Sequence, residues 1–168
     1  MLPPNLPAPL ILPVEDFARA LPTDGRLMAL DVGTKTIGIA ISDTTRMVAS
    51  GLETLARTKF GAAADQLRNR AQTHAIVGIV IGLPINLDGS GGPRAQATKA
   101  FAANLAPRLG LPILLWDERL STIAAERSLL EADASRKRRK EVIDKVAAVI
   151  ILQGVLERMR RLREVLRN

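Results

Sequence analysis

The chain has 168 residues, which suits one compact domain with a short appendage. Apolar residues make up 47% of it and aromatic residues only 2%, so Ala, Leu, Ile and Val must form the core. It contains no cysteine, which excludes disulfides and thiolate chemistry and fits a cytoplasmic location. No apolar run approaches the roughly 18–20 residues that span a bilayer, so we expect no membrane attachment.

The formal net charge is +7, and its distribution is uneven. Residues 136–168 contain 11 Lys or Arg and 4 Asp or Glu, which accounts for the whole excess. A concentrated basic segment favours an anionic partner, nucleic acid first. The alternative is a solvated, Arg-rich helix end stabilised by the helix dipole. Because aromatic residues are scarce, nucleic acid would be held through its phosphates rather than by base stacking.

The N-terminal segment, residues 1–25, contains six of the ten prolines and is expected to be an extension, with a helical turn or two around 14–21. The main domain is expected to span 26–168. In chain order we expect strands at 27–32, 36–43 and 48–55, a helix at 62–73, a strand at 74–85, a helix at 93–109 and a strand at 111–118. A short helix capped by Ser121 or Thr122, a basic loop and a long helix from 141 to about 163 follow.

This order of elements predicts an α/β fold. Three leading antiparallel strands followed by βα units imply a mixed five-stranded sheet flanked by helices on both faces. The pattern does not determine the spatial order of the strands.

Carboxylates occupy unusual places in this pattern. Asp31 interrupts the apolar first strand, and Asp117 and Glu118 end the last one. Ligand chemistry in such folds gathers beyond the carboxyl ends of parallel strands. Because side chains alternate along a strand, only one of Asp117 and Glu118 can point into a shared site.

A third acid, Asp144, lies near the start of the final helix. Its helical neighbours three, four and seven residues on are Ala147, Ala148 and Ile151, which would form the face toward the sheet. Converging carboxylates repel each other unless a cation lies among them. Oxygen ligands favour Mg²⁺ or Mn²⁺, which can support phosphodiester hydrolysis.

Each acid also has a structural interpretation. Asp31 could form an Asx-turn with the backbone that follows it. Asp117 or Glu118 could pair with Arg119 at the strand end. Asp144 could satisfy free amides at the helix N-terminus.

The loop "GLPINLDGSGGPRA", residues 82–95, joins a buried strand to a helix. Its glycines Gly89, Gly91 and Gly92 leave backbone amides available for an anion, and Arg94 adds a positive charge in the first helical turn. The alternative is an ordinary Asp-Gly turn before a helix that begins at Pro93.

Four ordered blocks, "ALDVGTKTIGIAISD", "GLPINLDGSGGPRA", "WDERLST" and "IDKVAAVIIL", resemble the signature blocks of the YqgF/RuvX family. The resemblance implies a ribonuclease H-like fold, a cytoplasmic location and a metal-dependent nuclease. It links the chain to 5′-end maturation of pre-16S ribosomal RNA or to Holliday-junction resolution. By motif position, Asp31, Glu118 and Asp144 are the catalytic, metal-binding acids, and Asp117 stays open. The family usually has Arg at the position of Thr36, so one phosphate contact there is in doubt.

Three hypotheses follow. The first is a Mg²⁺- or Mn²⁺-dependent endonuclease for structured RNA, or for branched DNA, acting as a monomer or homodimer. Its expected phosphate contacts are all basic residues: Lys35, Arg94, Arg119, Arg136, Lys137, Arg138, Arg139 and Lys140. The second is an actin-like or sugar-kinase ATPase, suggested by "DVGT", but that class needs two such domains. The third is a non-catalytic nucleic-acid-binding assembly factor.

Overall fold

The computed structural model of the chain describes residues 10–120 and 136–167, and in the second range it describes side chains only from residue 145 onward. Within these residues no helix is long and apolar enough to cross a membrane. The short helix expected after Ser121 or Thr122 lies outside the described residues.

One mixed sheet of five strands organises the molecule, with the order β3-β2-β1-β4-β5. The strands are β1 (Arg26–Val32), β2 (Thr36–Ser42), β3 (Ala49–Ala56), β4 (Ile76–Leu83) and β5 (Ile113–Asp117). The first three pair antiparallel, and β1, β4 and β5 pair in parallel. The predicted mixed sheet with three leading antiparallel strands is therefore confirmed, and the first strand, β1, lies at its centre.

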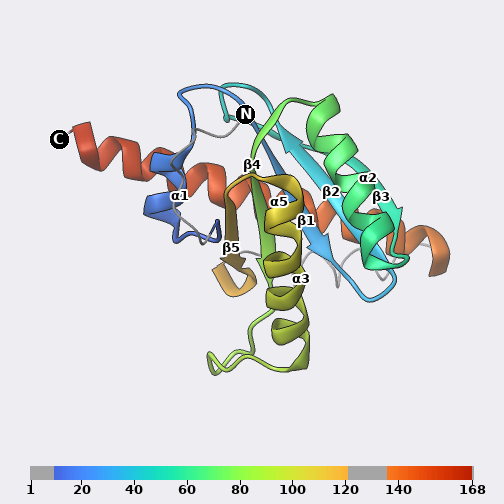
Figure 1. Ribbon diagram of the computed structural model, residues 1–168. Helices are drawn as coiled ribbons and strands as arrows, with labels where there is room; N and C mark the ends of the chain where they lie inside the picture. The colour runs from blue at the N-terminus through green and yellow to red at the C-terminus, as the bar shows by residue number, and fades with distance from the viewer. Residues whose placement is uncertain (1–9, 121–135, 168) are drawn as a thin grey trace.

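Helices cover both faces of this sheet, as predicted (Figure 1). On one face, α2 (Phe60–Thr73) and α3 (Pro93–Leu109) pack on alternate residues of the strands, among them Met28, Leu30 and Ile81. On the other, α5 (Arg136–Arg167) packs on the intervening residues, such as Leu27 and Ala29. Because successive side chains of a strand point to opposite faces of the sheet, the strands contribute residues to two separate cores.

The described part of the N-terminal segment is attached to the domain. Ile11 forms a parallel bridge with Ile113 of β5, and the amide of Leu12 donates a 2.9 Å hydrogen bond to the Ile113 carbonyl. The helix α1 (Val14–Ala20) follows, and its Phe17 is completely buried in the core beneath α5. The expected helical turns are therefore present, and the apolar residues of this segment extend the α5-side core.

The final helix is longer than predicted. Helix α5 begins at Arg136, so the expectation that residues 136–140 form a basic loop is wrong. Arg and Lys are strong helix formers, and no Gly or Pro separates them from the apolar stripe that follows. The correction moves Asp144 out of the first turn of the helix.

Candidate active site

Asp31 lies near the carboxyl end of the central strand and is almost entirely buried, with 4% of its surface exposed. Its neighbours two and four residues earlier, Ala29 and Leu27, belong to the core beneath α5. By strand alternation, Asp31 therefore faces α5 rather than α2 and α3. A carboxylate in this position is costly to bury unless polar or charged groups compensate it.

Glycines flank Asp31 on both neighbouring strands. Gly38 of β2 is its partner in the antiparallel register. On the other side the parallel register pairs Leu30 with Ile81, so the next residues along, Asp31 and Gly82, run side by side. Without side chains on either flank, the surface of the sheet around Asp31 stays open toward α5.

The Glu118 carboxylate occupies the space that Gly82 leaves. Glu118 begins a short 3₁₀ helix directly after β5. A Cβ atom on Gly82 would lie 2.8 Å from Glu118 Oε1 and 2.5 Å from Ile151 Cδ1 of α5. The Glu118 carboxylate therefore reaches back over β4 on the face that carries Asp31. The structure brings these two predicted acids to one place at the carboxyl ends of β1 and β5.

The neighbouring acid, Asp117, is held in a local ion pair. Its carboxylate accepts hydrogen bonds from the Arg119 amide at 2.9 Å and from Arg119 Nη2 at 2.7 Å. The hydrogen bond from the Arg119 side chain holds the pKa of Asp117 below its ordinary value. The predicted strand-end salt bridge thus involves Asp117, while Glu118 reaches over Gly82.

The same pair limits what Arg119 can do. Its guanidinium is engaged by Asp117, and Nη1 lies 3.5 Å from the position that a Cβ on Gly89 would take. Arg119 therefore bridges the end of β5 and the loop before α3, and much of its charge is already balanced by Asp117.

The turn after Asp31 is fixed by Arg57, which the sequence analysis did not single out. The Gly33 amide donates a 2.9 Å hydrogen bond to the Thr36 carbonyl, which closes the turn. Arg57 Nη1 donates a 2.6 Å hydrogen bond to the Gly33 carbonyl, and the Arg57 amide donates to the Lys35 carbonyl at 2.8 Å. The Lys35 side chain is exposed at the tip of the turn, as a phosphate contact would require.

The loop before α3 uses several of its own polar groups internally. The Gly89 amide donates to the Asn86 carbonyl at 2.9 Å, and the Ser90 amide donates to Asp88 Oδ1 at 2.8 Å. The Ser90 hydroxyl also donates to this carboxylate, and the two bonds lower the pKa of Asp88. Two amides of the predicted anion cradle are thus occupied. Arg94, in the first turn of α3, is exposed.

Asp144 lies on α5, but its side chain is outside the described part of the structure. The helix begins eight residues earlier, so its free N-terminal amides, which belong to its first four residues, are not near Asp144. The proposed capping role of Asp144 is therefore excluded. The helical stripe that Asp144 precedes, Ala147, Ala148 and Ile151, is fully or almost fully buried against the sheet, as predicted.

The acids offer oxygen ligands only. Where the structure describes side chains, no group of three or more His, Cys, Asp or Glu residues forms a metal-binding cluster. Asp31 and Glu118 are two acids on one face, each engaged in further interactions, and the third predicted ligand is Asp144. This donor chemistry fits Mg²⁺ or Mn²⁺ and does not fit a soft metal. The side chains of the basic residues 136–140 are also outside the described residues.

Two residues of the site region were not predicted from the sequence. Gly82 sits inside the apolar run "IVIGLP", and an isolated glycine in a strand pattern signals close approach of another group. Arg57 carried no such signal, because its partner Gly33 is 24 residues away and meets it only in the folded sheet.

Comparisons with known proteins identify the family of the chain and its relatives. A model of the RuvX family, described as Holliday junction resolvase, matches residues 25–158. A curated relative from Paracoccus denitrificans, named "Putative pre-16S rRNA nuclease", is 62% identical over 147 residues, or 88% of this chain and 93% of the relative. A relative of the same name from Rhodobacter capsulatus is 56% identical over 149 residues, or 89% of this chain and 94% of the relative.

Solved structures share the fold. Thermus thermophilus RuvC in complex with a Holliday junction substrate matches with a TM-score of 0.52 at 10% identity, covering 81% of this chain and 96% of that one. The yeast mitochondrial Holliday junction resolvase Ydc2 matches with a TM-score of 0.51 at 12% identity, covering 90% and 86%. The fold is therefore the ribonuclease H-like fold of RuvC-like resolvases. Because the family model spans most of the chain, the chain belongs to the RuvX family.

Proposed function

We propose that the chain is a metal-dependent endonuclease that hydrolyses phosphodiester bonds, with precursor 16S ribosomal RNA as its substrate. The observation that carries the proposal is the meeting of Asp31 and the Glu118 carboxylate beside Gly82 on the α5 face of the sheet. Two acids from the ends of separate strands could hold a cation against a phosphate there. The names of the curated relatives support the choice of substrate.

Each residue has a stated role in this proposal. Asp31, Glu118 and Asp144 would hold Mg²⁺ or Mn²⁺, and Gly38 and Gly82 leave the space for the acids. When bound, such an ion activates a water molecule and stabilises the leaving oxygen of the phosphodiester.

Basic residues would bind the substrate backbone. Lys35 is exposed in the turn after β1, and Arg94 is exposed in the first turn of α3, which follows β4. Arg119 would contribute less, because Asp117 already engages it. Residues 136–140 are still proposed to contact phosphates, but as the first residues of helix α5 rather than as a loop. A cytoplasmic location stays a prediction.

A second substrate, branched DNA, is favoured by one observation. The Thermus RuvC that shares this fold is in complex with a Holliday junction. A symmetric junction is cut in two places, which would require a homodimer, whereas a single cut in RNA needs only one copy.

The deciding experiment compares two substrates of matched length, a precursor-rRNA fragment and a DNA four-way junction, each with Mg²⁺, Mn²⁺ and EDTA. We expect wild-type protein to cut the RNA faster with a divalent metal and not to cut it in EDTA. Asp31→Asn should abolish cleavage while its melting temperature stays within a few degrees of wild type.

Neighbouring acids supply the matched control. Glu118→Gln should behave like Asp31→Asn, whereas Asp117→Asn should lose much less activity because it removes only a surface ion pair. If Asp31→Asn cuts RNA at the wild-type rate, the assignment of the site is wrong. If wild-type protein binds both substrates in EDTA but cuts neither with any metal, the chain is a non-catalytic binding factor.

A further inference from the structure

The sheet face covered by α2 and α3 carries a second concentration of positive charge. Residues 57–110, which include both helices, contain seven Lys or Arg and two Asp or Glu, a net charge of +5. One cation, Arg70, is paired with Glu53 of β3. The exposed cations of this surface, which we call the α2–α3 face, are Lys59, Arg68, Arg94 and Arg108.

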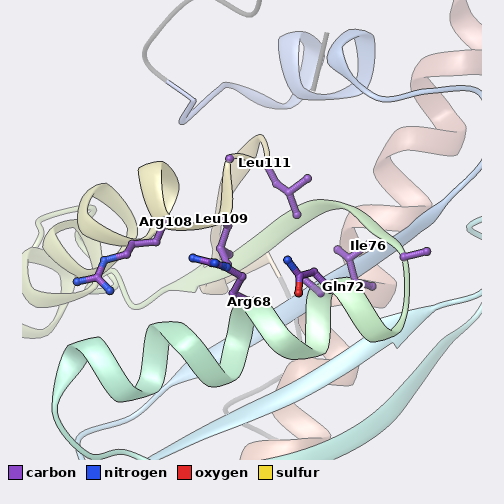
Figure 2. Close-up of a pocket in the computed structure, with 9 residues that line it drawn as sticks. Arg68, Gln72, Ile76, Arg108, Leu109 and Leu111 are labelled. Atoms are coloured by element: carbon purple, nitrogen blue, oxygen red, sulfur yellow. The ribbon is translucent and has the colours of Figure 1, made fainter. Parts of the chain in front are cut away.

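A hollow of about 510 Å³ lies between the C-terminal ends of α2 and α3. Figure 2 shows Arg68 and Gln72 rising from α2 toward the end of α3, where Arg108, Leu109 and Leu111 lie. Among the described residues, no acidic side chain lines the hollow. Its charged side chains can therefore donate hydrogen bonds to an anion, and most of its other lining residues are apolar.

The hollow is connected to the proposed active site along α3. Arg94 and Arg108 are fourteen residues apart, close to four complete helical turns, so they lie on the same side of the helix. At 1.5 Å per residue their backbones are about 21 Å apart, which corresponds to roughly seven base-pair steps of an A-form RNA duplex. Arg94 lies at the N-terminal end of α3, next to the proposed active site, and the hollow lies at the C-terminal end of the same helix.

The aromatic residues near this face are not available for stacking on bases. Phe60 and Phe101 pack edge to face at 5.5 Å. Arg57 covers the Phe101 ring at 5.3 Å, and Arg108 covers the Phe60 ring at 5.6 Å. The face therefore offers charge and hydrogen-bond donors, which suits a sugar–phosphate backbone and not unpaired bases.

We propose that the α2–α3 face binds the backbone of the RNA substrate away from the cleavage point, with Arg68 contacting phosphates at the hollow and Arg108 contacting them beside it, where its guanidinium lies over the Phe60 ring. This inference rests on the proposed function for the identity of the ligand. The partner follows from charge complementarity: four exposed cations, a hollow with no acid among its described lining residues, and two arginines on one side of α3 that lead from the site to the hollow.

The test measures equilibrium binding of a precursor-rRNA duplex in EDTA, so that cleavage is not required. Arg68→Gln and Arg108→Gln should each weaken binding several-fold at low salt and reduce the slope of log K against log salt by about 1. Arg108→Lys keeps the charge and should bind nearly as wild type. Arg19→Gln removes one charge from α1, outside the face, and should leave the slope unchanged.

Substrate length gives a second readout. Shortening the duplex flank from about twelve to about three base pairs should remove the difference between wild type and Arg108→Gln, since the hollow lies roughly seven steps from Arg94. If both glutamine variants keep the wild-type slope and only melt earlier, Arg108 serves the C-terminal dipole of α3 and the inference is wrong. Weakened binding of a DNA junction but not of RNA would also overturn it.

The two proposals can fail separately. Cleavage by wild type with unchanged binding of both variants would refute the α2–α3 face and leave the nuclease intact. Variant-sensitive binding of RNA without any metal-dependent cleavage would support the face and refute the nuclease.

Discussion

Replacing Gly82 with alanine tests the central feature of the proposed site. The new Cβ would lie 2.8 Å from Glu118 Oε1 and 2.5 Å from Ile151 Cδ1, both shorter than atoms normally approach. Since carbon and oxygen atoms need about 3.4 Å, the Glu118 carboxylate must retreat by roughly 0.6 Å. Ile151 is fully buried in the core beneath α5 and has little room to move.

Two consequences of different size are expected. Overpacking a core by one methyl group costs about 1–3 kcal/mol of unfolding free energy, offset by about 0.5–1 kcal/mol because alanine restricts the unfolded chain more than glycine. Displacement of a catalytic group by 1 Å can cost about 100-fold in rate. For a shift of roughly 0.6 Å we expect cleavage to fall about 10- to 100-fold, far more than the loss of folded protein would explain.

The same strand supplies the matched control. A Cβ on Gly78, four residues earlier in β4, would lie 2.7 Å from Leu21 Cδ2 and 2.9 Å from Phe17 Cζ, with no carboxylate nearby. Gly78→Ala should therefore lose a similar amount of stability and keep its cleavage rate. A second variant, Gly82→Ala with Ile151→Val, removes the atom at 2.5 Å and leaves the contact with Glu118.

The assay measures metal-dependent cleavage of precursor RNA beside the melting temperature of each variant. The double variant should recover stability but not activity, because the displaced group is the carboxylate. If the double variant recovers full activity, or if Gly78→Ala loses as much activity as Gly82→Ala, packing rather than carboxylate position controls the rate and the reasoning is refuted.

Three further predictions concern other parts of the fold. Arg57→Gln removes the hydrogen bond to the Gly33 carbonyl and should lower the free energy of unfolding, measured with denaturant, by about 1–3 kcal/mol. It should also slow cleavage, because the turn beside Asp31 is then less well fixed, and unchanged cleavage would contradict this role of Arg57. Phe17→Ala should cost about 3–5 kcal/mol, because the side chain is completely buried, and a loss below about 1 kcal/mol would mean that α1 is not part of the domain. Hydrogen bonds, first from Thr45, lower the pKa of Asp43 from 3.8 to about 2. Its stabilisation should thus be complete above the unfolded value of 3.8 and be lost as pH falls through about 2, on the order of 1 kcal/mol after screening, and Asp43→Asn should lack this step in urea titrations.

Local sequence patterns predicted the helices and strands because the spacing of apolar residues reflects which side chains of an element are buried. The apolar run around Asp31 placed it on a strand, and "GGP" marked the start of α3 at Pro93, where the helix begins. The error at residues 136–140 has the same origin. A run of charges was interpreted as a loop, although Arg and Lys propagate a helix well when apolar residues downstream anchor it.

The choice between Asp117 and Glu118 needed the tertiary structure. Both acids end the same strand, and the sequence could say only that they face opposite ways. The ion pair of Asp117 with Arg119 and the reach of Glu118 over Gly82 depend on the pairing of β4 with β5 and on the placement of α5.

By itself, the sequence determined that the chain forms a mixed α/β sheet with acids at the ends of its strands, because periodicity and the succession of elements along the chain can be found from local patterns. Only the tertiary structure decided that Asp31 lies between two glycines, and that Arg57 holds the turn after it. The net charge of +5 in residues 57–110 is balanced by acidic residues elsewhere in the chain. The tertiary structure decided that most of these cations lie on α2 and α3, on one side of the sheet. Contacts between residues far apart in sequence arise only when strands pair and helices dock, and no local pattern encodes them.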